Sequence, residues 1–194
     1  MPASNICDFI DVLNQDAECE ENFSGTAERI YLFKKSQLYD STEKKYVYPE
    51  VDTDNAAYTA SSFANLQGKL VGVDIKPNSG QVTWTNTPDG GGFTNVGRFI
   101  VSKGMKKFSR LARAMNATDF GVLIPTGNGN ECYVLFSQYA SAQFQLEGDT
   151  GANPDDEHGH TVTCTCAKMK YPAMTWAGPA TGSLDDWLAS ASAQ

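Results

Sequence analysis

The sequence predicts a mainly β protein with one α-helix. Short apolar runs bounded by Gly, Asn and Pro recur along the chain, which is typical of strands joined by turns. Only in 105–116 do apolar residues recur at three- and four-residue spacing, and this is the pattern of an amphipathic helix. Two apolar runs then follow, 120–125 and 132–136, joined by a turn of Gly and Asn. We therefore expect 94–136 to be the centre of the fold.

Other strands are expected on both sides of that centre. The run 29–33, rich in β-favouring residues, predicts the first secure strand, and 46–48 is the best candidate within a polar loop. Downstream, 141–148 and 160–171 read as strands. In the last of these, alternation predicts one face of Thr161, Thr163 and Thr165 and another of Val162, Cys164 and Cys166.

A hairpin is expected between 69–76 and 81–86. Both runs alternate in polarity, and the four residues 77–80, Pro-Asn-Ser-Gly, form a typical turn. The period of two predicts three core-facing residues in the first strand, Val71, Val73 and Ile75, and two residues on one face of the second, Val82 and Trp84.

The length of 194 residues favours one domain with extended arms. We expect an acidic N-terminal arm over 1–26, a β domain over 27–176 and a C-terminal tail over 177–194. In the tail, Ser183 is a candidate cap for a short helix with an apolar side of Leu184, Trp187 and Leu188.

The charge balance argues against a general nucleic-acid binder. The chain has 15 Lys and Arg against 23 Asp and Glu, a formal charge of −8. No apolar run approaches the ~20 residues that span a bilayer, and the N-terminus lacks the features of a signal peptide. We expect synthesis in a reducing cytoplasm and no membrane partner. Five cysteines, an odd number, are then expected to be free thiols: Cys7, Cys19, Cys132, Cys164 and Cys166.

Two clusters resemble metal sites in composition, but their spacing does not favour them. In an extended strand His158 and Cys166 would lie ~26 Å apart, and His160 and Cys166 ~20 Å apart. Zinc ligands must instead converge within ~2.3 Å of one ion. The acidic run 149–157 lacks the alternate-residue ligands of a calcium loop, and Pro154 interrupts it. We expect a polar loop leading into a strand, with no metal.

No motif for an enzyme is present in the sequence. Both histidines fall in one loop, so a triad of nucleophile, histidine and acid has little material to draw on. There is no phosphate-binding loop, and the Cys-Thr-Cys pair is not a redox C-x-x-C. We predict a protein without enzymatic activity and without a cofactor.

Basic residues gather on or beside the predicted helix. They are Lys103, Lys106, Lys107, Arg110 and Arg113. An ordinary solvated helix face is one interpretation, and a contact with nucleic acid or with an acidic surface of another subunit is the other. The acidic arm favours the subunit contact, because the chain then carries both halves of a charge complement.

The order of these elements resembles a known family. A Cys-containing leader precedes RIYLF, and the basic helix leads into GVLIPTGNGNECYVLF. A Gly-rich turn at 148–151 then precedes an acidic loop and a Gly-x-Thr strand that closes near Pro172. Over about 29–176 this resembles the tail tube (major tail) proteins of tailed bacteriophages, especially those from phages and prophages of Bacteroides-like hosts. The long insertion 40–62 and the residues after Ala177 depart from the pattern.

The resemblance implies a β-sandwich or half-barrel with one flanking helix and extended loops and termini. It implies a virion protein, made in the host cytoplasm, whose hexameric rings stack into a tail tube. Its partners would be further copies of itself, other tail proteins and the genome, which passes through the lumen without specific binding. The alternatives are a head-tail connector, tail terminator or capsid decoration protein of related fold, or a nucleic-acid-binding module that uses the basic helix.

Overall fold

The structure is a computed structural model of the full chain. It describes residues 25–63, 66–87, 91–101, 105–117, 119–149 and 159–192. Nearly all of the predicted arm over 1–26, with Cys7 and Cys19, therefore lies outside the described residues, as do His158 and most of the acidic run 149–157.

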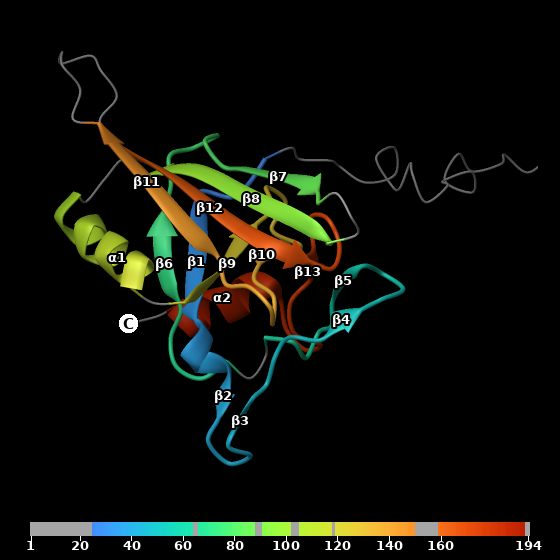
Figure 1. The fold of residues 1–194 in the computed structure, drawn as a ribbon. Coiled ribbons are helices and arrows are strands. Elements are labelled where there is room, and N and C mark those ends of the chain that lie inside the picture. Colours follow the sequence, from blue (N-terminus) through green and yellow to red (C-terminus); the bar gives the residue numbers. More distant parts are fainter. Residues whose placement is uncertain are drawn as a thin grey trace, which may run out of the picture.

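Two antiparallel sheets form the body of the molecule (Figure 1). The five-stranded sheet has the order β13 (Thr175–Trp176), β10 (Cys132–Leu135), β9 (Phe120–Pro125), β1 (Arg29–Lys34) and β6 (Val71–Asp74). The four-stranded sheet has the order β11 (Gln143–Asp149), β12 (Gly159–Met169), β8 (Phe93–Val101) and β7 (Gln81–Asn86). The mainly β fold is thus confirmed, and neither sheet closes on itself.

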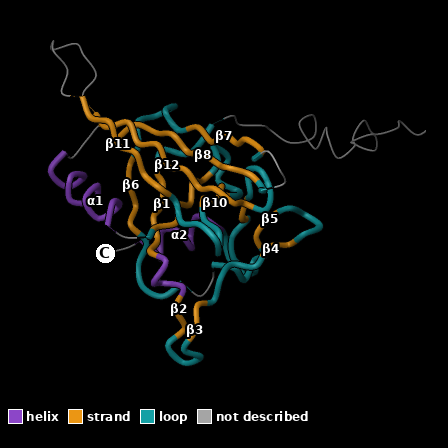
Figure 2. Tube along the Cα trace, in the orientation of Figure 1, coloured by secondary structure: helices purple, strands orange, loops and turns teal. Residues whose placement is uncertain are grey.

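Shorter elements complete the described chain. A 3₁₀ turn, η2 (Lys35–Leu38), follows β1. Two small hairpins come next, β2 (Tyr39–Asp40) with β3 (Lys45–Tyr46) and β4 (Val51–Asp52) with β5 (Ala57–Tyr58). The described residues hold two α-helices, α1 (Met105–Ala117) and α2 (Leu184–Ser192), where the fold class predicted from the sequence had one (Figure 2).

One part of the core lies between the two sheets. A methyl group placed on Gly97 of β8 would lie 2.8 Å from Sγ of Cys164 and 2.9 Å from Cδ1 of Ile124, so the inner faces of the sheets are in close contact there. All six residues of β9 are buried. This explains its uninterrupted apolar sequence, because a strand covered on both faces needs no polar side.

The other face of the five-stranded sheet is covered by aromatic side chains and α2. Edge-to-face ring contacts form a continuous chain. Phe136 contacts Phe33 (centroids 5.2 Å apart), and Phe33 contacts Phe63 (5.6 Å). Phe63 in turn contacts Trp176 (5.1 Å), and Trp176 contacts Trp187 of α2 (4.9 Å). Such pairs add about 0.5–1.5 kcal/mol each beyond their buried area. This layer therefore joins the C-terminal helix to the sheet.

The residues after Ala177 are part of this packing. The Ser183 Oγ accepts a hydrogen bond of 3.1 Å from the Asp186 amide, which is the cap expected at the start of α2. Leu184 and Leu188 belong to the buried core, with exposed fractions of 4% and 1%. The predicted tail thus contains a helix that covers the sheet.

The predicted hairpin over 69–86 is wrong. The first strand, β6, pairs with β1 in one sheet, whereas β7 pairs with β8 in the other. The segment between them turns a corner: the Ile75 amide donates to Glu28, and the Lys76 amide donates to Ile100 of β8. The Ser79 hydroxyl also accepts a hydrogen bond from the Ile100 amide. The turn residues are therefore bonded to a third strand.

Val71, which was expected to face the core, and Trp84, which was expected on the same face as Val82, are both exposed. Val71 lies on β6, at the edge of its sheet, and is 40% exposed. Trp84 lies on β7, at the edge of the other sheet, and is 50% exposed. Val73 and Ile75 are buried as expected.

Candidate assembly interface

The outward side of the four-stranded sheet is a polar surface. The register aligns its side chains in rows, such as Gln145, Thr163, Arg98 and Gln81 across all four strands. None of the side chains is buried. We call this surface the polar face; it consists of Gln81, Thr83, Thr85, Thr94, Val96, Arg98, Ile100, Gln143, Gln145, Glu147, Thr161, Thr163 and Thr165.

Among its described side chains, the polar face carries one cation and one anion, Arg98 and Glu147. Strand β12, one of the two inner strands, contributes Thr161, Thr163 and Thr165 to this face. The alternate residues of β12 are fully buried: Val162, Cys164 and Cys166. The two faces predicted for this strand are thus confirmed. Arg98 was not among the residues predicted for a site, although alternation along Thr94–Val101 places it on the side opposite the buried Phe99.

Both edges of this sheet are open among the described residues. β7 pairs with β8 alone, and β11 pairs with β12 alone. Every neighbouring pair is antiparallel, so with four strands the two edge strands run in opposite directions. Unpaired N–H and C=O groups on such edges can bond to a further strand.

The β7 edge also carries an apolar side chain that the monomer does not cover. Trp84 is aligned with Asn95, which is buried on the inner side of the sheet, yet its own side chain is 50% exposed. Val82 on the same side is half-buried. An aromatic of this size, exposed beside an open strand, is typical of interface positions.

The opposite edge is covered on its inner side by α1. The helix packs against β11, with Met115 buried and Leu111 half-buried. The Phe144 ring of β11 meets Phe120 edge-to-face at 6.4 Å. Helix α1 therefore lies beside the strand that ends the sheet (Figure 2).

The five predicted contact residues are only partly placed. Lys103 lies outside the described residues, and the side chains of Lys106 and Lys107 on α1 are not among those described. Arg110 and Arg113 are exposed, and neither pairs with a carboxylate among the described residues. The subunit contact through this helix stays a prediction.

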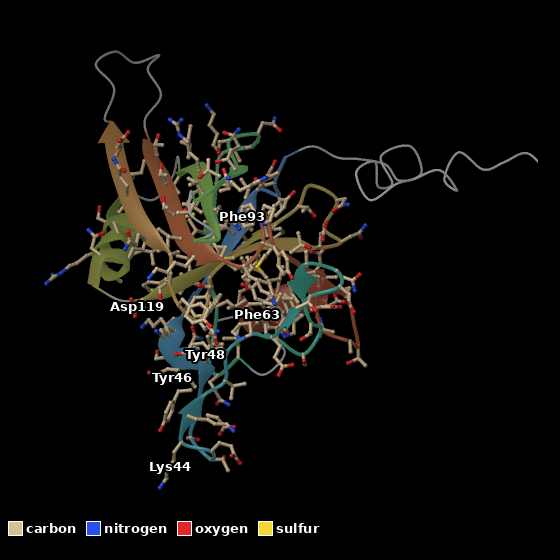
Figure 3. The ribbon with its side chains drawn as sticks, turned by 45° about the vertical axis from the view of Figure 1, so that its right-hand side comes forward. Lys44, Tyr46, Tyr48, Phe63, Phe93 and Asp119 are labelled. Carbon is tan, nitrogen blue, oxygen red and sulfur yellow. The ribbon has the colours of Figure 1, made fainter. Side chains whose placement is uncertain are left out.

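A tyrosine-rich hairpin projects from the body of the molecule. Tyr39 and Tyr46 face each other across β2 and β3 at 5.3 Å, and Tyr48 stacks on Tyr46 at 5.9 Å. Tyr39 and Tyr46 are 40% and 44% exposed. Figure 3 shows Tyr46 and Tyr48 between the core and Lys44 at the tip. The sequence of this region had predicted a loop that carries short strands, with 46–48 as the best candidate.

The cysteines of the described chain act as apolar packing. Cys132, Cys164 and Cys166 are free and buried, in agreement with the prediction of free thiols. Burial raises the pKa of Cys164 and of Cys166 to about 12, so both stay protonated at neutral pH. Within the described ranges, no three His, Cys, Asp or Glu side chains are placed to share a metal ion.

A search of protein-family models, curated proteins and solved structures found no significant match to this chain. In the part of the chain that the structure describes, neither helix has the length and apolar character needed to cross a membrane.

Proposed function

We propose that this protein is a structural subunit of a phage tail tube, in which copies join edge to edge into rings. One observation carries the proposal: among the described residues, the four-stranded sheet has two open, oppositely directed edges, and one of them exposes Trp84. The order of elements that resembles tail tube proteins supports the same assignment.

Edge-to-edge joining would pair the strand edges that are open in the monomer and cover its exposed Trp84. When β7 of one copy pairs with β11 of the next, the antiparallel pattern continues across the boundary and each edge gains hydrogen-bond partners. Trp84 would then be covered by the neighbouring copy. Repetition around an axis removes every open edge of this sheet. Six copies per ring is the number that the resemblance implies.

The polar face is assigned to the lumen in this proposal. Thr and Gln side chains keep such a surface wetted. Among its described side chains, the positive charge of Arg98 balances the negative charge of Glu147. A neutral polar wall gives DNA few phosphate contacts, so that the genome slides without being held. The proposed location is the virion tail, after synthesis in the host cytoplasm.

Electron microscopy of the purified full-length chain tests the proposal. Rings or tubes are expected, and Trp84→Asp should abolish them, because a carboxylate at that position would be buried between two copies. Val71→Asp is the matched control, since Val71 is also an exposed apolar residue on an edge strand, but of the other sheet. A protein that stays monomeric at high concentration would overturn the proposal. Labelling of intact particles separates the tube from a connector, terminator or decoration role.

A further inference from the structure

A groove of about 1000 Å³ lies beside the end of the four-stranded sheet. Its floor is apolar: the half-buried Tyr48, Pro49 and Val51 line it, above Phe136, Met169 and Met174, which are each at most 1% exposed. Tyr139, which is 72% exposed, also lines the groove. We call this the side groove. It is distinct from the polar face and from the exposed Trp84.

The backbone departs from regular strand geometry at two points of the side groove. One extra residue in β12 makes a bulge between Cys166 and Met169, and Lys168 there has a φ of 58°. Gly92 of the facing loop has a φ of 87°, and a side chain there would meet the Met169 carbonyl oxygen at 2.6 Å. The ends of β8 and β12 are thereby fixed at the groove.

Two lysines flank the apolar floor. Lys168 and Lys170 both line the side groove and are exposed. Lys170 lies over the ring of Tyr171 at 5.4 Å, and no described carboxylate pairs with Lys168. Glu50 is the acidic residue in the lining. The groove thus combines an apolar floor with an excess of positive charge.

The first 24 residues of the chain have the complementary chemistry. They contain no Lys or Arg. Their acidic residues are Asp8, Asp11, Asp16, Glu18, Glu20 and Glu21, and their larger apolar residues are Met1, Ile6, Phe9, Ile10, Val12, Leu13 and Phe23. Apolar and acidic residues alternate closely between 6 and 13, so one short segment can supply both kinds of contact.

The chain is long enough for this segment to reach the groove of its own molecule. The described chain begins at Gly25, whose carbonyl accepts a hydrogen bond from Gly127, and Thr26 lies against Gly80 just before β7. At the far end of β7, ~17 Å away along the strand, the Thr87 amide bonds to Gly92 in the groove lining. The 12 residues from Leu13 to Gly25 can span up to ~40 Å.

We propose that residues 6–13 bind in the side groove of the same chain, with Asp8 and Asp11 beside Lys168 and Lys170. The short tether favours this intramolecular contact over one between molecules. Helix α1 is a weaker candidate for the binding site of residues 6–13, because its apolar side already packs against β11. The inference does not rest on the tail-tube assignment, since the contact lies within one chain.

Cross-linking of the full-length protein from Cys7 to lysine amines tests the inference. Cys19→Ser leaves Cys7 as the only thiol of 1–24, and a maleimide at pH 7 reacts poorly with the buried Cys132, Cys164 and Cys166. With a short maleimide–succinimidyl ester reagent, mass spectrometry is expected to find Cys7 joined mainly to Lys168 and Lys170.

Variants and isotope mixing make the result decisive. Asp8→Asn with Asp11→Asn should lower that yield by about threefold to tenfold, as two exposed charge pairs are lost. Glu20→Gln with Glu21→Gln is the control and should leave it unchanged. In a mixture of ¹⁴N and ¹⁵N protein, the joined peptides should share one isotope. Cross-links mainly to Lys106 and Lys107, mixed isotopes, or a yield insensitive to the Asp changes would each overturn the inference.

Discussion

Gly121 of β9 lies opposite Phe33 of β1, and the Phe33 ring occupies the space where a side chain would be. The ring is fully buried and has neighbours on two sides, Phe63 and Phe136, so it cannot move aside. We expect Gly121→Ala to lower the free energy of unfolding by about 1–3 kcal/mol through overpacking. Urea denaturation measures the loss.

A smaller residue at position 33 provides the control for this prediction. Phe33→Leu alone leaves a partly empty site, but combined with Gly121→Ala it makes room for the new methyl group. The loss of unfolding free energy in the double variant should therefore be smaller than the sum of the losses in the two single variants. Full additivity would contradict the packing argument.

The buried thiols predict a loss of stability in alkali. Burial raises the pKa of Cys164 and of Cys166 from 9.0 to about 12, and raises that of Cys132 as well. Between these values the unfolded chain loses thiol protons that the native protein keeps. The free energy of unfolding is therefore unaffected below about pH 8 and falls as pH rises through 9, by up to about 1.4 kcal/mol per pH unit for each thiol.

Denaturant titrations from pH 7 to 10.5 measure this slope. Cys164→Ala removes one of the titrating groups and should make the decline shallower, whatever it does to stability at pH 7. A slope that Cys164→Ala leaves unchanged would show that the thiols are not its source.

At the scale of elements, α2 depends on its cap. Ser183 accepts the Asp186 amide, and Asp185 and Asp186 place negative charge in the first turn, where the helix dipole favours it. Ser183→Ala should lower the free energy of unfolding by about 1 kcal/mol. Ser190, which donates to the Trp187 carbonyl from the exposed side of the same helix, offers the control. Ser190→Ala should change stability by less than about 0.5 kcal/mol, and an equal loss in both variants would contradict the role of the cap.

The corner between β6 and β7 shows where sequence reasoning failed. Two alternating runs around Pro-Asn-Ser-Gly describe a hairpin and a sheet-to-sheet corner equally well. The difference lies in Ile100, a residue far along the chain that bonds to both Lys76 and Ser79. Alternation of polar and apolar residues predicted the two strands, because it depends only on neighbouring residues. It contains no information on which strands β6 and β7 pair with.

The candidate interface was predictable only in part for the same reason. Alternation in β12 correctly separated the Thr face from the buried Cys face. The exposure of Trp84 follows from where β7 lies in the sheet order, and that order is set by long-range pairing. The basic helix could be recognised from the sequence, because its charged residues are close together in the chain. The rows of the polar face could not, because they form only when four distant strands are aligned.

At the scale of the whole molecule, the proposed ring requires copies to join head to tail. The two edges of the four-stranded sheet are different strands, β7 and β11, so an edge-to-edge contact between them uses two different surfaces and can continue around an axis. A contact of β7 with β7 would instead close a dimer after two copies. Trp84 alone does not distinguish these cases, because both would cover it.

Engineered disulfides separate the two arrangements. In a background with Cys7→Ser and Cys19→Ser, Thr83→Cys and Gln145→Cys place one thiol on each edge strand, both on the polar face. Head-to-tail joining predicts that the double variant, once oxidised, gives a ladder of covalent multimers on a denaturing gel. Each single variant should give monomers, because its thiol has no partner. Neighbouring positions Gln81, Thr85 and Gln143 allow for a different register across the boundary. Dimers from Thr83→Cys alone would show that β7 meets β7, and a two-fold dimer would then replace the ring as the unit of assembly.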